Sequence, residues 1–165
     1  MNWQERIRKT APISLLLKIP VPWVYILAYL LGVALQLLFP PRVHPNGMII
    51  PLKIAGAVVF AIGAFFAGWS LLIFHKARTT TTPGENPVRL ITWGPYRFTR
   101  NPMYVSLLLA YLGEAGMLVQ IWPVLVLPLL LAYIQGIVIP LEEEVLSRVY
   151  GKEYEVFCSR VRRWV

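Results

Sequence analysis

Four long apolar stretches divide the chain, and each has about the length of a membrane-spanning helix. A helix needs about 20 residues to cross a hydrocarbon core of about 30 Å, because each residue adds ~1.5 Å. The stretches cover Val21–Phe39, Met48–Phe74, Met103–Val119 and Ile121–Ile139. Lipid offers the backbone no hydrogen-bond partner, so the pattern predicts an all-α membrane protein of four transmembrane helices in a single domain over residues 1–165.

The apolar stretches also carry local features of membrane helices. Trp23 and Tyr25 stand where an interfacial aromatic belt is expected. Only Gln120 separates the third and fourth stretches, which predicts a tight antiparallel C-terminal hairpin. The second stretch contains small residues suited to close helix packing. These are Ala55, Gly56, Gly63, Ala67 and Gly68.

The chain after the fourth stretch predicts an amphipathic tail helix. It begins with three adjacent carboxylates, Glu142 to Glu144. Apolar residues then recur at helical spacing, with an interruption expected at Gly151, which favours a tail that lies on the bundle or on the membrane surface. They are Val145, Val149, Tyr154, Phe157 and Val161. The carboxylates could occupy the favourable first turn of that helix, although three together repel one another.

Charge predicts the orientation of the protein in the membrane. Only 15% of the 165 residues are charged and 57% are hydrophobic, whereas soluble domains are about 25% charged. Of the 16 lysines and arginines, 14 precede the first stretch, join the second to the third, or follow the fourth; Arg42 and Lys53 are the exceptions. The positive-inside rule therefore places both termini and the middle loop of this multi-pass protein in the cytoplasm. The net charge of +8 then needs no nucleic-acid partner, and no obligate protein partner is predicted.

The middle loop and the three carboxylates are the candidate chemistry. In the loop, Gly94-Pro95 predicts a turn and Pro102 a helix start, while aromatic residues alternate with arginines between them. By composition alone, an interfacial anchor on lipid phosphates is the simplest interpretation. If the tail folds under the bundle, however, loop and carboxylates enclose a pocket between bilayer and cytosol. Such a pocket suits a lipophilic substrate and a soluble cofactor.

Metal and disulfide chemistry find little support in the sequence. The single cysteine, Cys158, excludes a disulfide framework and a cysteine-based zinc site. No set of histidine, cysteine and acidic residues has metal-ligand spacing, so no metal site is expected.

Two segments together resemble a known family. The first is Gly-Pro-Tyr-Arg-Phe-Thr-Arg-Asn-Pro-Met-Tyr at residues 94–104. The second begins with Glu142-Glu143 after the helical hairpin and continues with Leu146, Tyr-Gly-Lys-Glu-Tyr at 150–154 and Val-Arg-Arg-Trp at 161–164. This ordered pattern is similar to the membrane-embedded isoprenylcysteine carboxyl methyltransferase and phospholipid methyltransferase superfamily, most strongly over residues 74–165.

The resemblance implies S-adenosyl-L-methionine as the cofactor, bound on the cytoplasmic side, and a lipophilic acceptor that enters from the membrane lipids. The acceptor could be a prenylcysteine-like carboxylate, a phospholipid amine or another small lipophile. Carried over to this chain, the cofactor-binding residues are Val88, Arg89, Leu90, Ile91, Tyr96, Asn101, Pro102, Met103, Tyr104, Glu142 and Glu143. The stretch from Val88 to Ile91 would contribute backbone contacts. No residue is assigned to the chemical step.

At two positions the chain differs from the family pattern. Asn101 stands where eukaryotic members carry histidine; its amide can still donate and accept hydrogen bonds, but it cannot titrate like an imidazole. Val138 stands where members that methylate prenylcysteine carry a substrate-binding arginine. This second difference argues against a prenylcysteine carboxylate as the acceptor.

Two alternatives remain from the sequence. Sterol reductases share part of the expected architecture, so a reductase with a nicotinamide cofactor is one. A non-catalytic membrane subunit or small transporter is the other, in which Glu114, the acid inside a predicted span, would work with Lys53. We expect a structural role for Glu114 near the outer surface.

Overall fold

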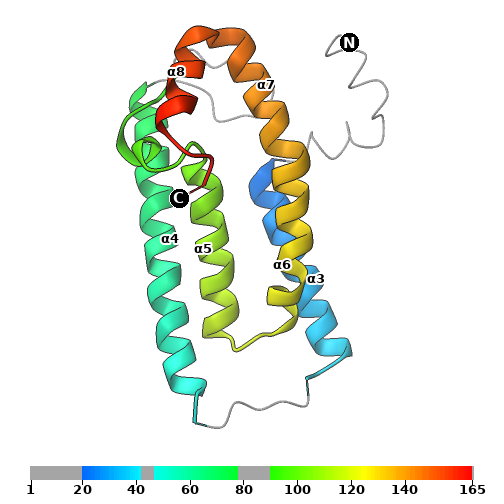
Figure 1. Cartoon of the computed structure of the whole chain (residues 1–165). Helices are drawn as coiled ribbons and strands as arrows, with labels where there is room; N and C mark the ends of the chain where they lie inside the picture. The colour runs from blue at the N-terminus through cyan, green and yellow to red at the C-terminus, as the bar shows by residue number, and fades with distance from the viewer. Residues whose placement is uncertain (1–19, 42–46, 78–89, 165) are drawn as a thin grey trace, which may run out of the picture.

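The fold is all-helical throughout the part of the chain that the structure describes. The computed structural model describes residues 20–41, 47–77 and 90–164. Within these ranges every regular element is a helix, which confirms the predicted fold class (Figure 1). The elements are α3 (Val21–Leu38), α4 (Ile49–Ala77), the 3₁₀ turn η1 (Gly94–Arg97), α5 (Pro102–Met117), α6 (Trp122–Tyr133), the π-helical turn η2 (Ile134–Val138), α7 (Ile139–Tyr150) and α8 (Lys152–Arg160).

Three helices in the described residues are long and apolar enough to cross a membrane. They are Val21–Leu38, Ile49–Ile73 and the uninterrupted helix Trp122–Tyr150. The third predicted span, α5, begins at Pro102 as expected but has 16 residues, a length of roughly 24 Å. The count of four transmembrane helices therefore stays a prediction.

The fourth predicted span does not end before the three carboxylates. α6, η2 and α7 form one helix of 29 residues, which is roughly 43 Å long and exceeds a hydrocarbon core of about 30 Å. Its first charged residue, Glu142, lies about 30 Å from its start by the same measure. The carboxylates therefore lie about one core thickness along the helix, on its last part, which we call the carboxylate end. Glu142 lies in the first turn of α7, but α7 continues directly from α6 and η2, so this turn is not the start of the whole helix.

Close packing in the bundle follows the glycines. α5 packs along α4, and the two backbones meet where a Cβ on Gly56, Gly63 or Gly113 would overlap the opposite helix. Two of the small residues expected to permit close packing, Gly56 and Gly63, therefore do so. Gly68 does not, because its Cβ position faces open space.

The predicted antiparallel hairpin between the third and fourth spans is confirmed, although the backbones of its two helices lie close at few positions. α5 and α6 run antiparallel and are joined by residues 118–121 (Figure 1). α6 packs along α3 instead, with Gly32 against Pro123. The bundle is therefore two helix pairs, α4 with α5 and α3 with α6.

The two aromatic residues at the start of α3 have different roles. Trp23 is 57% exposed, as a belt residue should be, whereas Tyr25 is 4% exposed. The ring of Tyr25 meets Tyr111 edge-on, and its hydroxyl donates to the carbonyl of Tyr104 at 3.4 Å. The prediction of Tyr25 as a belt residue is therefore wrong, because this side chain faces α5.

The chain turns back on itself at the carboxylate end. Gly151, with φ +51°, separates α7 from α8 at the predicted interruption. α8 buries Tyr154 and Phe157 in a cluster that includes Ile73 from α4 and Tyr96 from η1. Residues 161–164 then return to the start of α5 (Figure 1).

Candidate functional site

A buried tyrosine–glutamate pair joins α5 to α7. The hydroxyl of Tyr104, in the first turn of α5, donates to Glu142 Oε1 at 2.5 Å. Tyr104 is buried, and Pro102 before it is fully buried at the first helical position. A proline is tolerated there because the first helical N–H groups have no partner within the helix. The structure thus brings together two predicted site residues that are 38 positions apart.

Burial and a neighbouring charge make Glu142 an unusual carboxylate. Burial raises the pKa of Glu142 to about 7, the hydrogen bond from Tyr104 opposes this, and the charge of Glu143 adds to it. Within the described part of the chain, no cationic side chain contributes to this pKa. The site therefore holds a carboxylate without a cationic partner.

Tyr96 lies close to the same carboxylate. Its ring is buried in the η1 turn, and its pKa is raised by burial and by the charge of Glu142. The preceding Gly94 has φ +65°, and a Cβ there would overlap Ile73 of α4. A residue without a side chain is thus required for the turn to rest on α4.

Glu143, the next residue, has different neighbours. Both of its oxygens bind Arg163, with Nε to Oε1 at 3.1 Å and Nη2 to Oε2 at 2.5 Å. Arg100 Nη1 also lies 3.1 Å from Oε1, and it donates to Cys158 Sγ at 2.7 Å. The carboxylate of Glu143 therefore lies between two guanidinium groups, and the pKa of Arg163 is raised chiefly by its hydrogen bond to Glu143.

Asn101 faces the end of the chain. Its Nδ2 donates to the carbonyl of Arg163 at 3.0 Å, and Thr99 Oγ1 donates to the same carbonyl at 2.9 Å. The backbone N–H of Arg100 donates to the carbonyl of Arg162 at 2.9 Å. Three consecutive residues before α5 thus hold the residues that follow α8.

The remaining predicted site residues divide by burial. Leu90 and Ile91 are buried in the cluster with Tyr96, and Met103 is half-buried beside Pro102. Val88 and Arg89 lie outside the described residues. Val138, the position of the missing arginine, is 4% exposed and packs in the apolar core.

Comparison with protein-family models identifies the family of this chain. The model for phospholipid methyltransferases matches residues 52–153. The chain belongs to the phospholipid methyltransferase family. The match contains η1, α5 and the three carboxylates, so the recognised superfamily is confirmed and the protein is an integral membrane methyltransferase. No curated protein and no solved structure shows a significant match to the chain.

The boundaries of the family match differ from the resemblance seen in the sequence. The family model begins inside α4, at residue 52, although that helix reads as a generic apolar span. It ends at residue 153, before most of α8 and before residues 161–164. The contacts of Asn101 and Glu143 thus reach residues outside the part that defines the phospholipid methyltransferase family.

Several residues around the site were not predicted from the sequence. Tyr25 comes from α3, which the family model does not match, and Arg100 and Thr99 lie inside the recognised motif without an assigned role. Arg163 also lies in a quoted motif, and its pairing with an adjacent acid depends on the return of the tail. The two motifs contain Arg100 and Arg163, and a run of adjacent carboxylates includes Glu143. These opposite charges are the signal that could have suggested the ion pairs.

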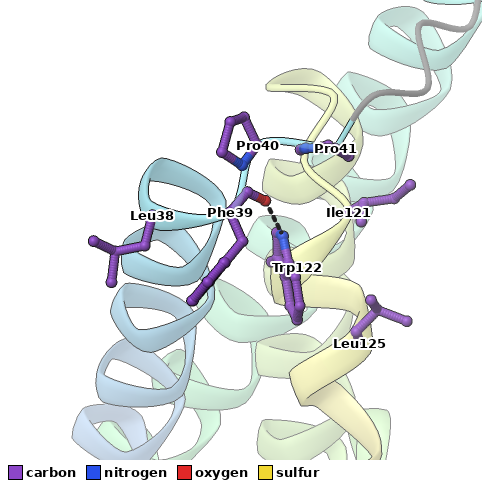
Figure 2. A pocket seen from close by; sticks show the side chains of 7 residues that line it. All are labelled: Leu38, Phe39, Pro40, Pro41, Ile121, Trp122 and Leu125. Carbon is purple, nitrogen blue, oxygen red and sulfur yellow. Dashed lines mark hydrogen bonds between the residues drawn. The ribbon is translucent and has the colours of Figure 1, made fainter.

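A groove at the opposite end of the bundle has no such chemistry. It has a volume of about 500 Å³ and is lined by residues of α3, α6 and their flanks. Figure 2 shows Trp122 against Phe39 there, with the indole N–H donating to the Phe39 carbonyl at 2.7 Å. All its lining residues are apolar or aromatic: Leu38, Phe39, Pro40, Pro41, Ile121, Trp122 and Leu125. We therefore place the candidate site of this phospholipid methyltransferase at the carboxylate end.

The described residues also hold no cluster of three or more potential metal ligands. The candidate site therefore consists of Tyr96, Tyr104, the backbone around them and the carboxylate of Glu142, which has no cationic partner among the described residues.

Proposed function

We propose that the protein transfers a methyl group from S-adenosylmethionine to the amine headgroup of a membrane phospholipid. The observation that carries this proposal is Glu142, a buried carboxylate bonded to Tyr104 and without a cationic partner among the described residues. It lies within the part of the chain that matches phospholipid methyltransferases.

The residues around Glu142 fit a cationic cofactor. When bound, S-adenosylmethionine supplies a methyl group on a positively charged sulfur, and this sulfur is the leaving group when the acceptor attacks the methyl carbon in line. Glu142 can accept hydrogen bonds from an ammonium group or from ribose hydroxyls. The rings of Tyr96 and Tyr104 can stabilise a nearby cation by about 0.5–2 kcal/mol. Their burial also excludes water, so the residues chiefly hold and orient the two reactants.

The charges of the site favour an amine over a carboxylate as the acceptor. An anionic acceptor would need a cationic side chain beside Glu142. Arg100 and Arg163, two arginines at this end of the molecule, both bind Glu143, and Val138 places an apolar side chain where an arginine would serve. An amine meets no such requirement: a carboxylate attracts its protonated form, which releases a proton to solvent before the neutral nitrogen attacks the methyl group.

The position of the site suits reactants from two phases. Glu142 lies on the last part of a helix that is longer than a hydrocarbon core is thick, and we propose that this end faces the cytoplasm, where the cofactor is dissolved. The lipid acceptor would arrive along the bundle. Glu114 and Lys53, the pair that a transporter would use, form no ion pair in the described part of the chain.

Cofactor titration with two matched glutamine variants tests the proposal. Glu142→Gln should weaken S-adenosylmethionine binding at least about tenfold, because it removes a charge-assisted hydrogen bond at a buried position. Glu144→Gln is the control: Glu144 belongs to the same triplet but pairs with Arg148 at the surface, 3.4 Å away. Equilibrium dialysis with labelled cofactor in detergent measures both. Unchanged binding in Glu142→Gln would refute the proposed site.

The acceptor is tested separately with purified lipids. Methyl-labelled S-adenosylmethionine and vesicles of an ethanolamine phospholipid should give labelled lipid, whereas a prenylcysteine with a free carboxylate should not. Label in the prenylcysteine alone would contradict the amine assignment and leave the cofactor assignment standing.

A further inference from the structure

The C-terminal segment, Val161–Trp164, connects the two helix pairs at the carboxylate end. On one side its backbone carbonyls accept from Arg100, Thr99 and Asn101, just before α5. On the other side the Trp164 indole donates to Gln135 Oε1 at 2.6 Å, in η2. The segment thus touches both α5's start and the α6–α7 helix.

The side chain of Asn101 binds the C-terminal segment instead of capping the helix that it precedes. Asparagine before a helix usually accepts a hydrogen bond from an N–H of the first turn through its side chain. At the start of α5 no side-chain cap forms, and the amide of Asn101 instead donates to the carbonyl of Arg163, 62 residues away. The backbone carbonyl of Asn101 accepts from Tyr104 N–H at 3.0 Å. Asn101 therefore connects the segment to the turn that carries Tyr104.

Glu143 makes the corresponding connection from α7. Its side chain is 19% exposed and already accepts from Arg163 at both oxygens and lies beside Arg100. A cofactor ammonium that took this carboxylate would displace a guanidinium with two parallel hydrogen bonds, which is a strong arrangement. Glu142, by contrast, accepts a hydrogen bond from the Tyr104 hydroxyl and has no cationic partner among the described residues.

These contacts bear on the spacing of Tyr104 and Glu142. The backbones of α5 and α6 lie close at few positions, although side chains of both helices share one buried cluster. Groups at the carboxylate end therefore contribute to the distance between α5 and α7. The bond from Tyr104 to Glu142 is one of them, but it involves the carboxylate that a ligand would bind. The contacts of Asn101 and Glu143 do not involve that carboxylate.

We propose that Asn101 and Glu143 are positioning residues, which fasten the C-terminal segment between α5 and α7 and so hold Tyr104 and Glu142 at the spacing for cofactor binding. This inference rests on the proposed function, and it departs from the direct cofactor contacts that the family resemblance implies for these two residues. Asn101 acts through a backbone carbonyl of the segment, and Glu143 acts through a guanidinium.

The test combines Asn101→Ala with a full-length variant in which Arg163→Ala and Trp164→Ala release the segment. The first readout needs no cofactor: hydrogen exchange of the Arg100 N–H, which is protected by the Arg162 carbonyl. Asn101→Ala should speed this exchange about three- to tenfold, as expected for the loss of one hydrogen bond that helps to dock the segment. The second readout is the dissociation constant for S-adenosylmethionine in all four combinations.

The four combinations separate a positioning role from direct contact. If Asn101 acts through the segment, Asn101→Ala weakens cofactor binding in the wild-type background but has little further effect once the segment is released. If it weakens binding by the same factor in both backgrounds, Asn101 touches the cofactor and the inference is wrong. Unchanged Arg100 exchange in Asn101→Ala also overturns it.

Glu143 is tested by conservative replacement of its partner. Arg163→Lys keeps a cation for Glu143 and should retain most of the cofactor affinity, whereas Arg163→Ala should lose as much as Glu143→Gln. A loss in Glu143→Gln alone would indicate direct contact with the cofactor. If the wild-type protein binds no S-adenosylmethionine, the proposed function fails, while the exchange measurement still decides whether Asn101 holds the segment.

Discussion

Glu142 and Glu143 show how one step along a helix separates two chemistries. Neighbouring residues on an α-helix point about 100° apart. Glu142 therefore meets the hydroxyl of Tyr104, and Glu143 meets Arg100 and Arg163. Burial without a cation favours the neutral form of the first, whereas two guanidinium groups compensate the charge of the second. Of the two, only Glu142 lacks a cationic partner among the described residues and could therefore bind a cationic ligand.

The raised pKa of Glu142 predicts pH-dependent cofactor binding. Burial holds this pKa at about 7, so at pH 5.5 the group is mostly protonated and cannot pair with a cation. Affinity for S-adenosylmethionine should increase about tenfold from pH 5.5 to 7 and then level off as ionisation completes. Titrations at a series of pH values check this, and Glu142→Gln should remove the dependence. A similar slope in that variant would assign the titration to another group.

The same shift has a consequence for stability that runs the other way. In the unfolded chain the carboxyl returns to its ordinary pKa near 4.5, so between about pH 4.5 and 7 the unfolded state binds fewer protons. Without cofactor, the free energy of unfolding should therefore fall as pH rises through this window. The protein gives up stability to keep an unpaired carboxylate in a buried place.

At the scale of elements, glycines set the distance between α4 and α5. Gly113 lies against Phe60, and Gly56 lies against Gly116. The two backbones approach so closely that a methyl group on Gly113 or on Gly56 would overlap the opposite helix. In lipid there is little hydrophobic drive to associate helices, so such contact of backbones is a main source of attraction. This packing fixes α5, and with it Tyr104, relative to the η1 turn on α4.

Two glycine-to-alanine changes should therefore have opposite consequences. Gly113→Ala places a methyl group against the backbone of Phe60 and should destabilise the protein by about 1–3 kcal/mol. Gly68→Ala is the matched control on α4, because its Cβ would meet nothing within 4 Å, and alanine favours a helix over glycine by about 0.5–1 kcal/mol. Thermal unfolding in detergent compares them. An unchanged midpoint in Gly113→Ala would mean that the two helices are not packed this closely.

At the scale of the whole molecule, the helix pairs and the returning tail place all the candidate chemistry at one end. α8 packs on α4 and η1, and the C-terminal segment reaches η2, so three separate parts of the chain meet over Glu142's end of the bundle. The opposite end holds the apolar groove of Figure 2, without a titratable side chain in its lining. Of the basic residues that predict a cytoplasmic face, those that the structure describes belong to elements at the carboxylate end.

Single cysteines should report this orientation in sealed vesicles of known sidedness. With Cys158→Ser as background, Lys152→Cys in α8 and Met48→Cys before α4 are both at exposed positions. A membrane-impermeant maleimide should label Lys152→Cys from the cytoplasmic side and Met48→Cys from the other side. Labelling of both from one side would contradict the four-span prediction, and reversed labelling would contradict the orientation.

The amino-acid pattern was sufficient for the all-helical class, for most helix boundaries and for the two motifs of the site. Apolar runs and their prolines act locally: Pro102 begins α5 and Gly151 ends α7, as their backbone preferences require. The family motif likewise predicted that the carboxylates and Tyr104 share one site, and in the structure Tyr104 contacts Glu142. These are properties of neighbouring residues, which a sequence displays directly.

Partners that are distant in sequence came from the folded molecule alone. The pairing of α5 with α4 rather than α6, the turn of Tyr25 toward α5 and the hold of Asn101 on Arg163 all depend on how helices of similar composition pack. An apolar face does not specify which other apolar face it will meet, because the energy of burial has no direction. The sequence thus predicted a membrane methyltransferase with two glutamates in its site. Packing distinguished Glu142, which has no cationic partner among the described residues, from Glu143, which Arg100 and Arg163 bind.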